Sequence, residues 1–152
     1  MIKIKRTDST NSGFIGLVQL LDADLKIRDG VEHDFYHQFN AIVDIKNCIV
    51  LYEDETPIGC GAIKLYDEKT IEIKRMYVLP EHRGKGIAVR ILFELEIWAQ
   101  ELGFSKCILE TGFKQPEAIA LYKKAGFKII PNYGQYIGVE NSVCFGKKLV
   151  RD

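Results

Sequence analysis

The segment from Pro80 to Arg90, PEHRGKGIAVR, places two glycines and three strongly basic residues before apolar residues at helical spacing. The first N–H groups of a helix have no partner within the helix and carry partial positive charge, so they can bind an anion. Glycine at positions 84 and 86 removes the β-carbons that would hold a phosphate away from these N–H groups, and Arg83 and Lys85 add charge. The pattern therefore predicts a phosphate-binding site at the start of a helix.

Three known phosphate-binding patterns can be compared with this segment. The P-loop, G-x-x-x-x-G-K-[ST], is absent from the chain. The dinucleotide fingerprint G-x-G-x-x-G is half met, with the acidic Glu110 after the next expected strand, but Val89 occupies the third glycine position. A solvated basic turn before a helix is the structural alternative. The third pattern, R-x-x-G-x-[GA], is met in full by Arg83, Gly86 and Ala88.

Through this third pattern the sequence resembles the GNAT superfamily of acyl-CoA-dependent N-acetyltransferases. The preceding strand IKRMYVLP and the later block ETGFKQPEAIALYKKAGF are also similar to the family, and the matching parts cover roughly residues 48–149. The resemblance implies that acetyl-CoA is a co-substrate and that the loop amides hold its pyrophosphate. Gln115 stands where many family members have asparagine. The implied acyl-CoA-binding residues are Met76, Tyr77, Val78, Arg83, Gly84, Lys85, Gly86, Ile87, Ala88 and Gln115.

Glu72 is the candidate general base. Period-two alternation in TIEIKRMYV predicts that Glu72 lies on the same strand face as Lys74, Met76 and Val78. The resemblance implies that a glutamate at this position takes the proton of the acceptor amine, directly or through water. An ion pair with Lys74 or with a neighbouring strand is the alternative role, and a β-bulge would reset the facing of this strand.

Tyr122, in QPEAIALYKKAGF, is the candidate general acid. The resemblance implies that its hydroxyl reaches the coenzyme A sulfur and protonates the departing thiolate. Aromatic packing beside Ile119 and Leu121 is the structural alternative.

The elements that must position these residues follow from hydrophobic periodicity. The periodicity predicts a mixed α/β (α+β) fold, and the resemblance implies that it is of the GNAT type, with a mostly antiparallel sheet flanked by helices and a central strand-loop-helix site. Strands 48–54, 58–66 and 70–79 should form an antiparallel meander. Further strands are expected at 2–6, 106–111, 127–131 and 142–149, and helices at 14–25, 34–39, 86–102 and 115–125.

Length and composition predict a single globular domain over residues 1–152, which the resemblance implies is an N-acetyltransferase domain. The 21 Lys and Arg residues balance the 21 Asp and Glu residues, so no overall field favours nucleic acid or a membrane as the partner. The chain start lacks the apolar run of a signal peptide, and a cytoplasmic location is expected. The four cysteines are widely spaced and are expected to be buried free thiols: Cys48, Cys60, Cys107 and Cys144.

The acceptor should be selected by residues 21–40 and by the loop 131–141, because loops carry variable specificity on a fixed scaffold. Acidic residues gather in the first of these segments and hint at a cationic acceptor, although solvated helix ends explain them equally well: Asp22, Asp24, Asp29, Glu32 and Asp34. His33 and His37 are four residues apart, but without a third ligand in view no metal site is expected.

Two functions are consistent with these observations. The first is transfer of an acetyl group from acetyl-CoA directly to a primary amine of a small molecule or peptide. The second is a catalytically silent acyl-CoA-binding or regulatory module, which would not need Glu72 or Tyr122. The sequence leaves the oligomeric state open, a homodimer included.

Overall fold

The computed structural model describes residues 1–29 and 45–149, and within these residues seven strands form one mixed sheet. The strands lie in the order β1-β2-β3-β4-β5-β7-β6, and all neighbours are antiparallel except β4 and β5, which are parallel. Their bounds are β1 Ile2–Thr7, β2 Asn47–Glu53, β3 Thr56–Leu65, β4 Thr70–Val78, β5 Lys106–Gly112, β6 Lys128–Ile130 and β7 Ser142–Lys148. Each strand expected from the sequence is confirmed, as is the meander β2-β3-β4.

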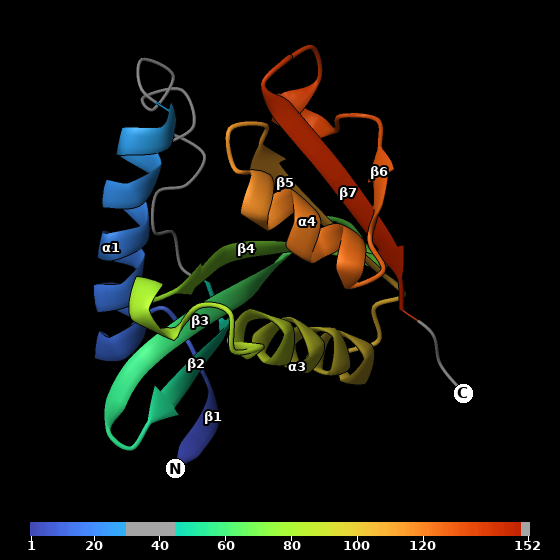
Figure 1. The fold of residues 1–152 in the computed structure, drawn as a ribbon. Helices are drawn as coiled ribbons and strands as arrows, with labels where there is room; N and C mark the ends of the chain where they lie inside the picture. The colour runs from blue at the N-terminus through green and yellow to red at the C-terminus, as the bar shows by residue number, and fades with distance from the viewer. Residues whose placement is uncertain (30–44, 150–152) are drawn as a thin grey trace.

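Helices cover both faces of the sheet (Figure 1). Helix α1 (Ser12–Asp29) lies on one face and packs Phe14, Leu17 and Val18 against β2 and β3. Helices α3 (Ile87–Glu101) and α4 (Pro116–Lys124) lie on the other face, over the largest of the three hydrophobic clusters among the described residues. The helix expected at 34–39 falls outside the described residues. Among the residues described, no helix is long and apolar enough to cross a bilayer.

The four cysteines are buried free thiols within strands, as the sequence predicts. Burial raises the pKa of Cys48 and of Cys107 to about 12 each. It raises that of Cys144 to about 11, and the pKa of Cys60 is raised by the same cause. These thiols are therefore protonated packing groups at neutral pH.

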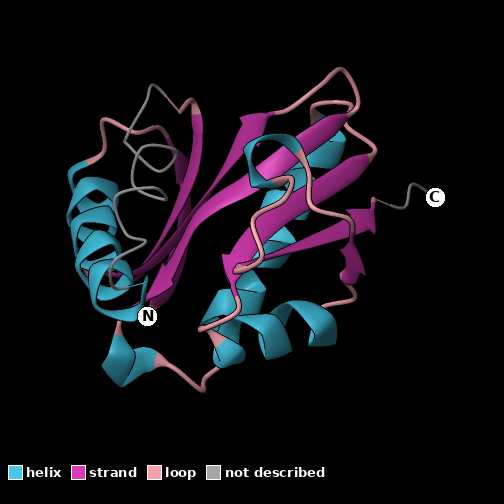
Figure 2. Ribbon diagram, turned by 90° about the horizontal axis from the view of Figure 1, so that it is seen from above, coloured by secondary structure: helices cyan, strands magenta, loops and turns pink. Residues whose placement is uncertain are grey.

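The sheet opens between its two parallel strands. β4 and β5 pair only over Thr70–Glu72 and Lys106–Ile108. Beyond Glu72 the two strands are no longer paired and diverge. Figure 2 shows the twist of the sheet, in which the strands at the two edges run in clearly different directions. This divergence separates the outer half of β4 from β5 and makes room for a ligand between them.

A β-bulge interrupts β4 at the same point. The register with β3 shifts between Cys60 and Ala62, which face Tyr77 and Lys74 respectively. Arg75 occupies the bulge with a positive φ of 62°, a left-handed conformation that is uncommon for a large residue.

The bulge overturns one prediction about β4. Glu72 and Lys74 do share a face, but Met76 and Val78 do not lie on it. The extra residue reverses the alternation, so that Met76 lies against Gly61 and Ile91 on the α3 side, and Val78 belongs to the cluster under α3.

Helix α3 rests almost directly on the backbone of β3. A β-carbon added at Gly61 would lie 2.6 Å from the Met76 sulfur and 2.9 Å from methyl carbons of Ile91 and Leu95. One added at Gly59 would lie 2.8 Å from Cδ1 of Ile91. The two glycines therefore allow the close approach of helix and sheet that sets the position of the loop before α3.

Candidate active site

A groove of about 400 Å³ runs between β4 and α4 and along the loop before α3. Nine of the ten residues predicted to bind acyl-CoA line it, and Lys85 is exposed beside it. One wall is β4, from Met76 to Val78, and the opposite wall is α4, with Gln115 at its N-cap position. The structure thus brings together residues that are far apart in the sequence.

The loop before α3 has the geometry that the glycine pattern predicts. Gly84 and Gly86 have φ angles of 78° and 79°, and Gly86 is the N-cap residue of α3. A β-carbon at either position would meet nothing within 4 Å, so the space in front of the loop is open. The first N–H groups of α3 therefore border the groove without steric cover and can bind an anion there.

Arg83 has a structural contact that the sequence did not predict. Its Nε–H donates a hydrogen bond to the Val78 carbonyl at 2.9 Å, and its guanidinium carbon lies 5.4 Å from the centre of the Tyr77 ring. Arg83 therefore ties the loop to the end of β4 as well as carrying positive charge at the groove.

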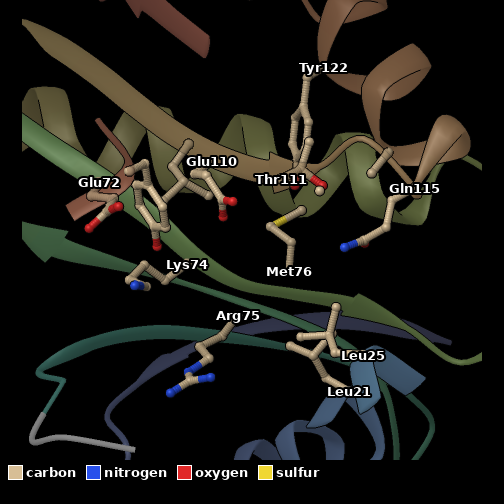
Figure 3. Close-up of a pocket in the computed structure, with 14 residues that line it drawn as sticks. Leu21, Leu25, Glu72, Lys74, Arg75, Met76, Glu110, Thr111, Gln115 and Tyr122 are labelled. Atoms are coloured by element: carbon tan, nitrogen blue, oxygen red, sulfur yellow. The ribbon is translucent and has the colours of Figure 1, made fainter. Parts of the chain in front are cut away.

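A second cavity, of about 120 Å³, continues from the groove toward the narrow end of the opening between β4 and β5 (Figure 3). It contains Glu72, together with Tyr136 from the loop that the sequence assigned to acceptor selection. Four more polar residues line it, to which sequence reasoning gave no role in acetyl transfer: Lys74, Arg75, Glu110 and Thr111. Met76, Gln115 and Tyr122 line both cavities, so they stand where the two meet.

Glu72 is 6% exposed and accepts a hydrogen bond of 2.6 Å from the Tyr133 hydroxyl. Tyr133 belongs to the loop before β7, which the sequence assigned to acceptor selection. The Asn132 side chain holds this loop by donating to the carbonyls of Tyr136, Val139 and Ser142. Burial and the nearby Glu72 carboxylate raise the pKa of Tyr133, so the phenol remains a donor to Glu72.

Lys74 lies beside Glu72 and is 9% exposed. Burial lowers the pKa of its ammonium group, and the neighbouring carboxylate of Glu72 partly opposes this change. The second cavity is therefore a poorly solvated place in which charges interact strongly.

Tyr122 is 7% exposed and projects from α4 toward the junction of the two cavities (Figure 3). Its ring packs against Phe127 and Phe145, with 5.9 Å between ring centres in each pair. Burial, and then the charge of Glu110, raise the pKa of its hydroxyl, so that Tyr122 is a protonated phenol at neutral pH. Tyr122 therefore has the aromatic packing that the structural alternative expected and also lies at the junction of the two cavities.

The acidic residues near α1 do not form a common wall in the described part of the chain. Asp22 lies 3.8 Å from the Arg75 guanidinium, and Asp24 lines the groove. The side chain of Asp29, together with Glu32, Asp34, His33 and His37, lies outside the described residues.

The charges of the second cavity were hidden from sequence reasoning for a local reason. Strict alternation sends Arg75 to the α3 face, and only the bulge turns it toward α1. The sequence singled out Glu110 only as part of a possible dinucleotide fingerprint. It lines the second cavity because β4 and β5 are no longer paired beyond Ile108.

Comparison with known proteins identifies the fold and the family. A profile of the acetyltransferase (GNAT) family matches residues 14–127. An IAA acetyltransferase of Azospirillum brasilense is 42% identical over 89 residues, which cover 58% of each chain. The uncharacterized N-acetyltransferase YjgM of Escherichia coli is 40% identical over 84 residues, 54% of this chain and 50% of that protein. The aligned part thus spans little more than half the length of these curated relatives.

Solved structures resemble the whole chain. A provisionally named acyl-CoA N-acyltransferase from Klebsiella pneumoniae superposes with a TM-score of 0.82 at 28% identity, covering 99% of both chains. The PaiA N-acetyltransferase of Thermoplasma acidophilum, crystallised with coenzyme A, has the same fold, with a TM-score of 0.72 at 21% identity and coverage of 97% of this chain and 99% of that chain. Together with the profile match over residues 14–127, these similarities show that the chain belongs to the GNAT acetyltransferase family.

Proposed function

We propose that this protein is an acetyl-CoA-dependent N-acetyltransferase whose acceptor is a primary amine of a small molecule or peptide. The observation that carries the proposal is the meeting of two cavities at Met76 and Tyr122. One is an open groove with an anion-binding helix start, and the other is a small polar cavity that holds Glu72. A binding module that only held acyl-CoA would need the groove alone.

The groove fits coenzyme A on the evidence of its own residues. Gly84 and Gly86 leave the start of α3 uncovered, which suits a pyrophosphate, and the outer half of β4 has no pairing with β5. The GNAT structures from Thermoplasma acidophilum and Salmonella typhimurium were solved with coenzyme A and acetyl-CoA respectively, which supports the same ligand here. When bound, acetyl-CoA supplies an activated acetyl thioester.

The acceptor amine must lose a proton before it can attack. A lysine-like amine with a pKa near ~10.4 is neutral in only about one molecule in 2,500 at pH 7, a cost of roughly 4.6 kcal/mol. For an α-amino group near pKa ~8 the cost is about 1.4 kcal/mol. We assign Glu72 as the base that accepts this proton, directly or through water, with Tyr133 holding its carboxylate.

Tyr122 is assigned as the general acid. Its raised pKa keeps the hydroxyl protonated until the thiolate departs, and its position at the junction suits a proton donor to sulfur. Backbone N–H groups of the Met76–Val78 segment are assigned to the pantetheine arm and the thioester oxygen. Fixed donors of this kind are typically worth ~3 kcal/mol each in the transition state.

A screen of acceptors tests the proposal. Amines, amino acids and short peptides are incubated with acetyl-CoA and the purified protein, and free thiol is measured against controls without acceptor. At least one acceptor should release thiol in proportion to protein. If calorimetry shows coenzyme A binding but no acceptor releases thiol, the protein is the silent acyl-CoA-binding module instead.

A further inference from the structure

The second cavity is lined by side chains of both charges in equal number. Glu72 and Glu110 are acidic, and Lys74 and Arg75 are basic. A cavity built for a simple cation would carry an excess of negative charge, because each desolvated cation needs a compensating partner. The balance found here fits a ligand that itself carries one positive and one negative group.

Arg75 has unused capacity to bind an anion. Its side chain is only 2% exposed, and its Nε is buried with no hydrogen-bond partner among residues 1–29 and 45–149. The carboxylate of Asp22 lies 3.8 Å from Nη1, beyond ordinary hydrogen-bond length. A planar guanidinium offers paired donors that match a carboxylate.

Arg75 lies apart from the two carboxylates, so it could bind the negative group of such a ligand while the positive group lies near Glu72 and Glu110. Figure 3 shows its guanidinium on the α1 side of β4, directed away from Tyr122, whereas the carboxylates of Glu72 and Glu110 lie nearer the Tyr122 side. The bulge in β4 produces this arrangement, because it sends Arg75 toward Asp22 on α1. An acid group held at Arg75 would leave an amine on the same small molecule facing the junction.

We propose that the acceptor is an amine of amino-acid size whose carboxylate binds Arg75, with Lys74 beside it, while its amino group lies toward Glu72 and Tyr122. This inference rests on the proposed function, since it names the substrate class of the same site. It also replaces the cationic acceptor that the acidic residues near α1 suggested. The cavity volume of about 120 Å³ suits a small molecule better than a long peptide segment.

Matched acceptors provide the test. Each amino acid is compared with its carboxamide and with its decarboxylated amine in the thiol-release assay. The carboxamide has the less basic α-amine, so a preference for the free acid cannot arise from amine ionisation. We expect kcat/KM to be at least tenfold higher for the preferred amino acid than for either analogue.

Two variants should move this preference in opposite directions. Arg75→Gln should lower kcat/KM for the amino acid at least tenfold more than for the two analogues, which abolishes the preference for the acid, and Arg75→Lys should restore part of it. Asp22→Asn removes the carboxylate that competes for Arg75, so it should lower KM for the amino acid alone. Lys5→Gln, which removes an exposed positive charge on β1, is the control and should change neither ratio.

The outcomes separate this inference from the proposed function. If amines are acetylated but the free acid has no advantage, or if Arg75→Gln slows all three acceptors equally, the assignment of Arg75 is wrong and the acetyltransferase stands. If no acceptor releases thiol, the acetyltransferase proposal fails. Calorimetric titration of amino acids into the coenzyme A-loaded protein then decides the inference alone, since binding must occur and must be lost in Arg75→Gln.

Discussion

Glu72 on β4 lines the second cavity, and Tyr122 on α4 lies where that cavity meets the groove. Each has a structural contact that would exist without catalysis, namely the Tyr133 hydroxyl for Glu72 and the aromatic packing for Tyr122. Substitutions that keep the packing and remove one functional group can therefore separate the two roles.

Tyr122→Phe keeps the ring between Phe127 and Phe145 and removes only the hydroxyl. If that hydroxyl protonates the thiolate, kcat should fall by ~10²-fold or more, the usual contribution of a general acid. Coenzyme A affinity, measured by calorimetry, should remain close to that of the wild type. Unchanged turnover would remove Tyr122 from the mechanism.

Glu72→Gln should slow turnover most at low pH. There the acceptor amine is almost fully protonated and depends on a base, whereas at high pH the free amine is already abundant. Rates of both proteins are measured from pH 6 to pH 10 with a saturating acceptor. A ratio of rates that does not change with pH would disqualify Glu72 as the base.

Among the elements, the loop before α3 depends on backbone conformation more than on side chains. Gly86, the N-cap residue of α3, has a φ of 79°. A methyl group added there would meet no neighbouring atom within 4 Å, so it would occupy open space beside the helix start. Gly103, just beyond the other end of α3, has a φ of 95° and equally open surroundings. The two positions form a matched pair.

Gly86→Ala and Gly103→Ala should each lower the free energy of unfolding by about 1–2 kcal/mol, the cost of a left-handed conformation for a residue with a β-carbon. Gly86→Ala alone should also weaken coenzyme A binding, by roughly tenfold, because its methyl group would occupy open space beside the helix start that is proposed to hold the pyrophosphate. Urea unfolding and calorimetry measure the two effects. Equal loss of affinity in both variants would show that the effect is strain and not access.

The elements were predictable from the sequence because their signals are local. Periodicity located every described strand and the helices α1, α3 and α4, and the glycine pattern located the loop with left-handed backbone. The facing of β4 beyond Arg75 was not predictable, because a bulge depends on pairing with β3, and Gly61 opposite it gives no separate signal. The charges of the second cavity depend on that bulge and on the opening between β4 and β5, so sequence reasoning found Glu72 and missed its neighbours.

At the scale of the whole molecule, the buried thiols make stability depend on pH. Their folded pKa values, about 12 for Cys48 and Cys107, lie above the ordinary thiol value of 9.0, so unfolding releases protons at alkaline pH. Their contribution to stability is therefore fully present below about pH 9 and is lost as the pH rises toward 12, with a slope of up to about 1.4 kcal/mol per pH unit for each thiol.

Cys107→Ala should reduce the slope with which the free energy of unfolding falls at alkaline pH, by the contribution of one thiol. Free energies of unfolding from urea titrations at pH 8, 9, 10 and 11 measure the slope. Between pH 7 and 8 the free energies of unfolding of the two proteins should change with pH in parallel, since the Cys107 thiol is mostly protonated there in both the folded and the unfolded state. Parallel curves at pH 10–11 as well would contradict a protonated buried thiol.

Gly59 and Gly61 of β3 allow the close packing of α3 that positions one side of the candidate site. Gly61 borders neither cavity, yet Ile91, Leu95 and Met76 all lie against its bare backbone. A β-carbon there would displace the sulfur of Met76, a residue that lines both cavities, and methyl groups of Ile91 and Leu95 on α3. Gly61→Ala should therefore change the shape of the groove through the Met76 side chain that it displaces, and trimming Ile91 or Leu95 would relieve only the contacts with the helix.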